Sequence, residues 1–447
     1  MDRMKRYRIV TLGCKVNQCE SAAIGHLLEQ QGFDCDAGAP DPDVVVINTC
    51  TVTGKAAMQS RQAIRKAVRS HPGARIVVTG CHVEVAAPAV GAMEGVHLVV
   101  DNGNKMELVA LLDRLSPAGG SAAPAFALRD GCTDHCFAAL PAVSRDDRTR
   151  AFLKIQDGCN TCCTYCIVPR TRGPSRSMPT ADVHRHMRRL GENGFREVVL
   201  TGIHLGAYGL DLEPPTTLTD LIDRLSSPPM VDRLRISSIE PTEITSALVA
   251  LFAQRAGALC PHFHVPLQSG DNGVLRRMGR QYTREQYTEV IHTIARSLPM
   301  AAIGVDVMAG FPGESEAAFE QTCALIQSLP VTYLHVFPFS PRQGTPAVRF
   351  TAKVPERIAK ERCRYLRAIG EEKRRRFMQS MVGRELVVLT QTLSSTPCPT
   401  ARGMSENYLP VLLSGVRLET NSLVRARIQG VSDAGILLGE QLPPVNP

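Results

Sequence analysis

The sequence predicts an α/β protein with three parts: an N-terminal open parallel α/β sheet, a central partial (β/α)6 barrel and a small C-terminal β-barrel. Three observations predict this order. Apolar, strand-like runs alternate with helix-like segments up to about residue 115, they alternate again from residue 151, and short β-rich runs alone fill the stretch after residue 381. Strands that alternate with helices are typical of βαβ units and parallel sheets. The 447 residues suffice for roughly two to four such domains.

The first domain is expected over residues 1–115. Its strand-like runs are RYRIVTLG (6–13), VVVINT (44–49), RIVVTG (75–80) and HLVV (97–100), with helices expected over about 21–31 and 55–70. The carboxyl ends of parallel strands meet at one edge of a sheet, so residues that follow these strands are expected to converge. Residues 116–148 are rich in Pro, Gly, Ala and Ser, which indicates a linker.

The central domain is expected over residues 149–380 and the last over 381–442. Six central runs read as strands: AFLKIQDG (151–158), EVVLTG (197–202), RLRISSIE (233–240), HFHVPLQ (262–268), IGVDVMAGFPG (303–313) and YLHVFPFSP (333–341). Helices between them favour a partial barrel, whose active site forms at the carboxyl ends of the strands. A basic helix is expected over about 355–380, and the short β-runs after it favour a small barrel.

Composition narrows the class of protein. No apolar run approaches the roughly 18 residues that span a bilayer. The first apolar stretch is interrupted at Lys15, Asn17 and Gln18, too early for a signal peptide, so a cytoplasmic protein is expected. In that compartment the fifteen cysteines are more often metal ligands or catalytic groups than disulfides. The formal charge of +8 mildly favours a polyanionic partner such as nucleic acid.

The most specific segment is DGCNTCCTYCIVPRTRG (157–173), in which Cys159, Cys163 and Cys166 form CxxxCxxC. Three thiolates on one loop can each hold an iron of a cubane cluster and leave the fourth iron open. Cys162 creates two abutting CxxC pairs, an alternative that would suggest zinc, but structural zinc sites separate their paired ligands by a longer loop. The spacing therefore favours the open cluster, with Cys162 as a small buried residue of no special role.

This loop resembles that of the radical S-adenosylmethionine enzymes, which carry an aromatic residue, here Tyr165, before the last cysteine. The resemblance implies that S-adenosylmethionine chelates the open iron and is split into methionine and a 5′-deoxyadenosyl radical. It also extends to motifs that follow the later strands. Four further residues in those motifs are candidates for binding this cofactor: Gly202, Ser237, Glu240 and Gln268. Nearby histidines, His204, His262 and His264, are expected to be ordinary polar residues.

Three cysteines of the first domain each follow a strand: Cys14, Cys50 and Cys81. A single such cysteine is more often a small buried residue, but the shared position suggests a common site. The segments LGCKVNQCES, INTCTVT and TGCHVE resemble the N-terminal domain of methylthiotransferases. That resemblance implies that the three bind an auxiliary [4Fe–4S] cluster, so two [4Fe–4S] clusters and S-adenosylmethionine are the expected cofactors. Other cysteines are left out of the site: Cys19, and Cys132 and Cys136 beside His135 in the linker.

Five arginines are candidates for binding the substrate. Arg170, Arg172 and Arg176 follow the cysteine loop and could pair with a phosphate or carboxylate, or could be solvated surface charge. The C-terminal domain resembles the TRAM barrel, which the family uses to hold RNA. Arg425 and Arg427 alternate along its strand LVRARI, so they face the same side and could follow a phosphate backbone.

The family resemblance implies the addition of a methylthio group to an unactivated carbon, with the two cysteine sets facing one cavity. LGCKVNQCES resembles the branch that modifies carbon 2 of N6-threonylcarbamoyladenosine next to the tRNA anticodon. The alternatives are isopentenyl-adenosine in tRNA, a ribosomal protein, or a non-catalytic iron–sulfur sensor that binds RNA. The implied partners are a tRNA anticodon stem-loop, S-adenosylmethionine and a flavodoxin- or ferredoxin-type electron donor, with no membrane.

Overall fold

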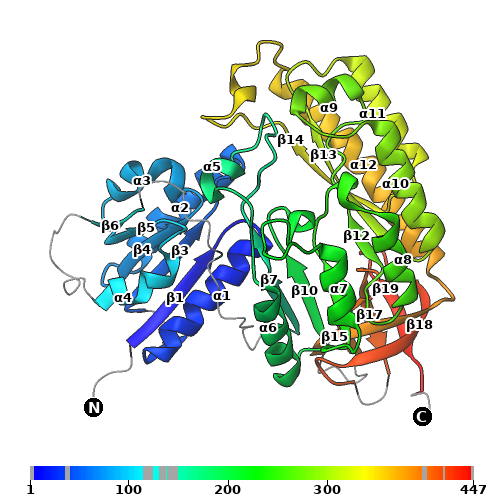
Figure 1. Cartoon of the computed structure of the whole chain (residues 1–447), viewed down its shortest axis with the longest axis horizontal. Helices are drawn as coiled ribbons and strands as arrows, with labels where there is room; N and C mark the ends of the chain where they lie inside the picture. The colour runs from blue at the N-terminus through cyan, green and yellow to red at the C-terminus, as the bar shows by residue number, and fades with distance from the viewer. Residues whose placement is uncertain are drawn as a thin grey trace. The chain divides into compact units, whose positions relative to one another are not determined.

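The computed structural model describes residues 5–35, 41–113, 124–129, 137, 149–394, 400–415 and 418–443. The chain divides into two compact units (Figure 1). The first unit comprises residues 1–145, 154–178 and 340–348, and the second comprises 146–153, 179–339 and 349–447. The first unit thus contains both the N-terminal sheet and the CxxxCxxC loop. The domain boundaries expected from the sequence stay a prediction.

The first unit is built on a parallel sheet of six strands in the order β2-β1-β3-β4-β5-β6. The strands are β1 (Lys5–Thr11), β2 (Phe33–Cys35), β3 (Val44–Thr49), β4 (Arg75–Gly80), β5 (Leu98–Val100) and β6 (Ala125–Ala127). The helices are α1 (Lys15–Gln30), α2 (Gly54–Ser70), α3 (Val83–Gly91), η1 (Lys105–Glu107) and α4 (Leu108–Asp113). The predicted open parallel sheet is confirmed.

Apolar residues cover both faces of this sheet. Alternate residues of β3 point to opposite sides, so that Val44 and Val46 join a core with α1 and α4, whereas Val45 and Ile47 join a core with α2 and α3. A strand buried on both faces reads as a continuous apolar run, as VVVINT does. The short edge strands β2 and β6 were not expected, and β6 lies within the stretch interpreted as a linker.

The second unit contains a six-stranded open barrel, as predicted. Its two three-stranded sheets have the orders β11-β10-β7 and β12-β13-β14. The strands are β7 (Arg150–Lys154), β10 (Glu197–Thr201), β11 (Arg233–Ile236), β12 (His262–His264), β13 (Ala302–Ala309) and β14 (Tyr333–Pro338). The main helices between and after them are α6 (Thr180–Glu192), α7 (Leu218–Ser226), α8 (Ser246–Gln254), α9 (Asn272–Met278), α10 (Arg284–Ser297), α11 (Glu316–Ser328) and α12 (Glu356–Ser380). A parallel bridge between Ser238 and His264 connects the two sheets.

The C-terminal part is a closed barrel of five strands, again as predicted. The strand order is β15-β16-β17-β19-β18, with β15 at Glu385–Ser394, β16 at Thr400–Ser405, β17 at Pro410–Ser414, β18 at Leu423–Val431 and β19 at Leu437–Gln441. Its interior is filled by alternating apolar side chains such as Val388, Ala426 and Ile428. Among the residues that the structure describes, no helix combines the length and the apolar character needed to cross a membrane.

A buried carboxylate fastens this small barrel to the larger one. Glu197, at the start of β10, accepts hydrogen bonds from Arg233 Nε at 2.6 Å and Arg235 Nε at 2.9 Å. The far side of the Arg233 guanidinium donates to the carbonyls of Val387 (3.0 Å) and Met404 (2.8 Å) in the small barrel. Burial alone would raise the pKa of Glu197, but the two arginines outweigh it and lower this pKa to about 2.

We expect Glu197→Gln to lower the free energy of unfolding by about 3–5 kcal/mol, because it leaves two buried guanidinium groups without a counter-charge. The control is Asp232→Asn, which breaks an exposed ion pair with Arg196 and should cost no more than about 1 kcal/mol. Urea unfolding at pH 7 measures both. Since the pKa of Glu197 is depressed, its contribution is complete above about pH 4.5 and is lost as the pH falls towards 2. Equal effects of the two substitutions would contradict this account.

Candidate active site

The auxiliary trio, Cys14, Cys50 and Cys81, lies along one edge of the N-terminal sheet. Cys14 is the N-cap of α1 just beyond β1, Cys50 directly follows β3, and Cys81 directly follows β4. Because β1, β3 and β4 are neighbours, their carboxyl ends bring the three cysteines together. Gly13 has a φ of +100°, and a Cβ there would lie 2.8 Å from Cys50 Sγ. The chain ends of β1 and β3 therefore approach each other as closely as a glycine allows.

The thiols of this trio share one electrostatic environment. Burial is the main cause that raises the pKa of Cys50 to about 11; a backbone hydrogen bond at Val52 and the charge of Arg172 oppose this rise, and the neighbouring thiols of Cys81 and Cys14 add to it. Metal ligands must be deprotonated thiolates. The site therefore has three convergent sulfur ligands and a cation that favours their charged form, which fits an iron–sulfur cluster.

The central trio, Cys159, Cys163 and Cys166, lies on the loop between β8 (Gln156–Asp157) and α5 (Val168–Arg172). All three are half-buried. The loop is shaped by hydrogen bonds from Cys159 N to Gly173 O and from Cys166 N to Cys163 O, both at 3.1 Å. Thr161 N also donates to Cys159 Sγ at 3.4 Å. Such donors stabilise the negative charge of a thiolate ligand.

Two residues next to the central trio, Gly158 and Cys162, differ in how closely the surrounding chain encloses them. Gly158 has a φ of +73°, and a Cβ at this position would lie 1.9 Å from Pro174 O, so only glycine fits. Cys162 is exposed, and its thiol lies 3.8 Å from Asn160 O as a weak hydrogen-bond donor. The expectation that Cys162 is buried was wrong, because it lies on the solvent side of the loop.

A buried guanidinium joins the two cysteine sets within the first unit. Arg172, at the end of α5, is 1% exposed. Its Nη1 donates to Glu20 Oε1 at 2.7 Å and to both carboxylate oxygens of Asp157 at 3.1 Å. Its Nη2 donates to Asn17 Oδ1 at 2.6 Å. Asp157 precedes Cys159 by two residues, and Asn17 and Glu20 lie on α1, which begins beyond Cys14.

The same network holds the ends of the strands. Asn17 Nδ2 donates to the carbonyls of Leu12 (2.6 Å) and Thr49 (3.0 Å), the residues just past β1 and at the end of β3. Asn17 therefore connects the segments that carry Cys14 and Cys50, while its own Oδ1 accepts from Arg172. Substitution of Arg172 therefore removes contacts both to Asn17, next to the auxiliary trio, and to Asp157, next to the central trio.

Two lysines complete the network. Lys105 Nζ pairs with Glu20, and Lys154 Nζ lies 3.3 Å from Glu20 and 3.1 Å from Asp157. Three cations and two carboxylates leave a formal charge of +1 in a buried region. These cations hold the pKa of Glu20 well below its usual range even though burial raises it. The excess positive charge lies beside the thiols that must become anionic.

The arginines predicted to bind substrate have different positions. Arg172 is enclosed by the network, which differs from the expectation that it meets a substrate. A short helix gives no periodic signal from which its burial could be recognised. Arg176 is half-buried, and its Nη2 donates to Arg172 O at 2.8 Å. Arg170 is exposed, so it alone of the three keeps the predicted accessible position.

The predicted cofactor-binding residues are divided between the units. Tyr165 is half-buried on the cysteine loop of the first unit, whereas Gly202, Ser237, Glu240 and Gln268 belong to the second. Ser237 and Gln268 follow β11 and β12, and their side-chain oxygens are buried without a hydrogen-bond partner. Buried polar atoms rarely lack partners. These two oxygens are therefore suited to a polar ligand such as a ribose or an adenine.

Glu240 is less available than expected. Its carboxylate pairs with Arg280, whose side chain is 4% exposed. Burial raises the pKa of Glu240, although Arg280 opposes this. The adjacent His204 pairs with Glu243 at 2.6 Å, in keeping with its expected role as an ordinary polar residue.

Cys19 is half-buried on α1, and burial raises its pKa to about 12. Cys132, His135 and Cys136 lie outside the described residues.

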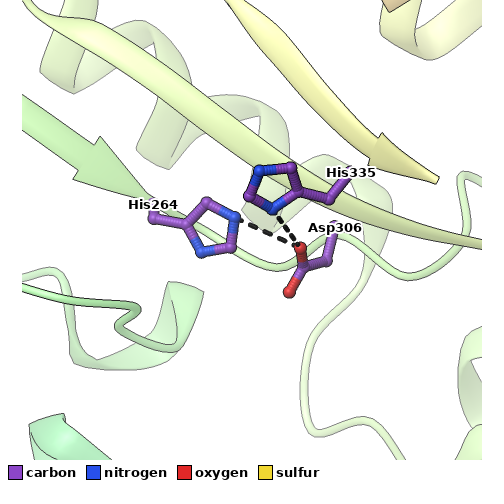
Figure 2. Close-up of side chains that lie close together, drawn as sticks. All are labelled: His264, Asp306 and His335. Atoms are coloured by element: carbon purple, nitrogen blue, oxygen red, sulfur yellow. Dashed lines mark hydrogen bonds and ion pairs between the residues drawn. The ribbon is translucent and has the colours of Figure 1, made fainter. Parts of the chain in front are cut away.

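Sequence reasoning missed one constellation, His264, Asp306 and His335, which Figure 2 shows on three neighbouring strands. Asp306 Oδ1 lies 3.2 Å from His264 Nε2 and 3.2 Å from His335 Nδ1. The two histidines hold the pKa of Asp306 well below its usual range, although burial raises it. The signal available in the sequence was a polar residue within or at the end of each of three successive strands.

On the C-terminal barrel, Arg425 and Arg427 alternate along β18 and are both exposed, so they share one face as predicted. Both pair with Glu385 on β15, at 2.6 and 2.8 Å. This carboxylate cancels one of the two positive charges and holds the guanidinium groups side by side. Their contact with RNA stays a prediction.

We expect Arg172→Met to lower the free energy of unfolding by about 3–5 kcal/mol, since it removes the cation that bridges two buried carboxylates. The matched control is Arg170→Met, an exposed arginine on the same helix, which should change stability by no more than about 0.5 kcal/mol. Urea unfolding of the two purified variants gives the comparison. If both variants unfold at the wild-type urea concentration, Arg172 does not join the two loops.

Comparison with known proteins identifies the family. Residues 153–326 match the family model of the Radical SAM superfamily, and residues 6–101 match that of the uncharacterized protein family UPF0004. The solved radical S-adenosylmethionine methyltransferase TsrM of Kitasatospora setae has a TM-score of 0.55 and 16% identity over 77% of each chain. That likeness supports the fold alone.

Curated relatives extend over nearly the whole chain. The threonylcarbamoyladenosine tRNA methylthiotransferase of Bacillus subtilis is 35% identical over 94% of this chain and 92% of its own length. Its counterpart in Aquifex aeolicus is 36% identical over 94% and 98%. The tRNA-2-methylthio-N(6)-dimethylallyladenosine synthase of Natranaerobius thermophilus is 31% identical over 86% of each chain. The cofactors are accordingly two [4Fe–4S] clusters and S-adenosylmethionine. The chain belongs to the radical S-adenosylmethionine tRNA methylthiotransferase family of enzymes.

Proposed function

We propose that this protein adds a methylthio group to carbon 2 of N6-threonylcarbamoyladenosine next to the anticodon of tRNA. The observation that carries the proposal is the similarity over nearly full length to two enzymes named for this nucleoside, at 35% and 36% identity. The relative named for dimethylallyladenosine is 31% identical over a smaller share of the chain. The alternative substrate that this relative supports is isopentenyl-adenosine in tRNA.

The chemistry explains why two cysteine trios are needed. A C–H bond on an adenine ring has no useful acidity, so acid–base catalysis cannot replace its hydrogen with sulfur. When bound, the central cluster supplies the electron that cleaves S-adenosylmethionine, and the auxiliary cluster presents the sulfur. The protein's own contribution is placement. The Arg172 network keeps Asp157, beside the central trio, and Asn17, beside the auxiliary trio, in fixed positions.

Binding of the tRNA is assigned to exposed cations. Arg425 and Arg427 form a pair on one face of the C-terminal barrel, and the fold of that barrel fits a TRAM domain. Arg170 adds an exposed cation beside the central trio. A single-stranded anticodon loop is the proposed RNA target, because its bases can turn outward without melting a duplex. A flavodoxin- or ferredoxin-type protein is the proposed electron donor, and the cytoplasm is the proposed location.

The substrate is tested by mass spectrometry of tRNA nucleosides from a strain that lacks the gene. We expect the methylthio-threonylcarbamoyl nucleoside to disappear and its precursor without the methylthio group to accumulate. Reintroduction of the wild-type gene should restore it. If that nucleoside persists while the methylthio-isopentenyl nucleoside disappears, the substrate is the isopentenyl form.

The division of roles between the trios predicts that two substitutions differ in their effect on cofactor cleavage. Cys50→Ala should leave reductive formation of 5′-deoxyadenosine intact but abolish sulfur insertion, whereas Cys163→Ala should abolish both. After anaerobic reconstitution each variant should hold roughly four irons per chain instead of roughly eight. Chromatography of the products and iron analysis measure these outcomes. A wild-type protein that binds both clusters yet never forms 5′-deoxyadenosine with a strong reductant would be an iron–sulfur sensor that binds RNA.

A further inference from the structure

Three polar side chains meet inside the barrel of the second unit (Figure 2). His264 ends β12, Asp306 lies on β13, and His335 lies on β14 opposite Asp306 in the parallel register. The ligand-type atoms of all three lie within 4.8 Å of one another. Residues that are 42 and 29 positions apart therefore form a single cluster across three neighbouring strands.

Alternation along the strands shows which face they occupy. Phe263 packs against Phe252 of the outer helix α8, with ring centroids 4.7 Å apart, so its neighbour His264 faces the other way. Leu334 lies against Gly370 of α12, so Tyr333 and His335 also face away from the helices. The ring of Tyr333 covers Gly304, two residues before Asp306, on this same face. The cluster therefore belongs to the inner face of the barrel.

The hydrogen bonds within the cluster are incomplete. His264 Nδ1 is bonded to Ser238 Oγ at 2.6 Å. His264 Nε2 is buried and lies 3.2 Å from Asp306 Oδ1, close enough for an ion pair but outside the geometry of a well-aligned hydrogen bond. Both imidazoles contact Oδ1 of Asp306, and Oδ2 of the same carboxylate has no partner among the described residues. The side chain of His335 is 60% exposed. The cluster thus has unused hydrogen-bonding capacity and is open on one side.

We infer that His264, Asp306 and His335 form the subsite for the polar substituent of the substrate, an inference that rests on the proposed function. The threonylcarbamoyl group carries a carboxylate, a hydroxyl and ureido N–H groups. His335 bonds to Asp306 through Nδ1, so its Nε2 is left to donate to the carboxylate, and the free oxygen of Asp306 suits the hydroxyl or an N–H donor. A dimethylallyl group has none of these, and it would leave the polar cluster unsatisfied.

Other buried atoms nearby show that this part of the barrel suits polar groups, whether they belong to the substrate or to the cofactor. Ser237, adjacent to the bonded Ser238, keeps its Oγ buried without a partner, and so does Gln268 with its Oε1. Gln268 has a φ of 65°, which is rare for a residue with a side chain, and its backbone pairs with β13 beside Asp306. A barrel interior with several unpaired polar atoms is suited to a polar ligand and not to a hydrocarbon.

The same three side chains resemble a two-histidine, one-carboxylate metal site. A divalent metal would need all three groups as ligands and would leave none of them for the substrate. Binding of Co²⁺ to the protein distinguishes this occupant from the substrate.

The test compares three anticodon stem-loops that carry N6-threonylcarbamoyladenosine, dimethylallyladenosine or unmodified adenosine at the same position. Their affinities are measured by fluorescence anisotropy with the full-length protein, reconstituted anaerobically. We expect His335→Gln and Asp306→Asn to weaken binding of the threonylcarbamoyl stem-loop roughly 10- to 100-fold and binding of the unmodified stem-loop less than about twofold. The control His292→Gln removes an imidazole outside the buried stripe of α10 and should change neither affinity.

The outcomes distinguish a wrong subsite from a wrong proposed function. If the wild type prefers the threonylcarbamoyl stem-loop and His335→Gln keeps that full preference, the subsite is wrong and the proposed function stands. If the wild type shows no preference and does not methylthiolate this stem-loop, the proposed function itself is wrong. One Co²⁺ bound per wild-type chain beyond the clusters, lost in His335→Gln without any change in RNA preference, would assign the cluster to a metal and overturn the inference.

Discussion

The site depends on one buried guanidinium. Arg172 bonds simultaneously to the carboxylate before the central trio and to two side chains on the helix that begins at the auxiliary trio. A planar group with five donors can satisfy several acceptors in fixed directions, which a lysine cannot do. The two cysteine sets come from segments about 80 to 150 residues apart in the sequence. This single side chain bonds to both segments and so holds the two cysteine sets in place within the first unit.

The charge of that network also bears on the chemistry of the sulfurs. Without a metal, burial keeps the Cys50 thiol protonated, with a pKa raised to about 11. Ligation requires thiolates, so the region must accept added negative charge. The three cations and two carboxylates of this network carry a formal charge of +1, and because these side chains are buried, that charge is screened less than it would be at the surface. Position and charge are thus provided by the same residues, and neither can be changed without affecting the other.

Apolar pattern was enough to predict most of the fold. VVVINT and RIVVTG are continuous apolar runs because β3 and β4 are covered on both faces. The three-residue edge strands β2 and β6 carry too short a pattern to be recognised. Position after a strand was likewise enough to bring Cys14, Cys50 and Cys81 to one edge. The burial of Arg172 was not predictable, because a charged residue on a five-residue helix has no periodicity that distinguishes a buried from a solvated position.

The inner cluster was missed for a related reason. Asp306 and His335 each interrupt an otherwise apolar stretch and His264 ends the short strand β12, and a single polar residue in a strand is normally explained by local hydrogen bonding. Their meaning depends on register, since Asp306 and His335 lie opposite each other only once β13 and β14 are paired. The helices on the outside of the barrel cover the outward-facing apolar residues such as Phe263 and Leu334. The inward-facing residues of the same strands are therefore free to carry polar groups that bind a ligand. Substrate preference within this fold can therefore change through a few inward residues while the outer, apolar positions that stabilise the barrel stay the same.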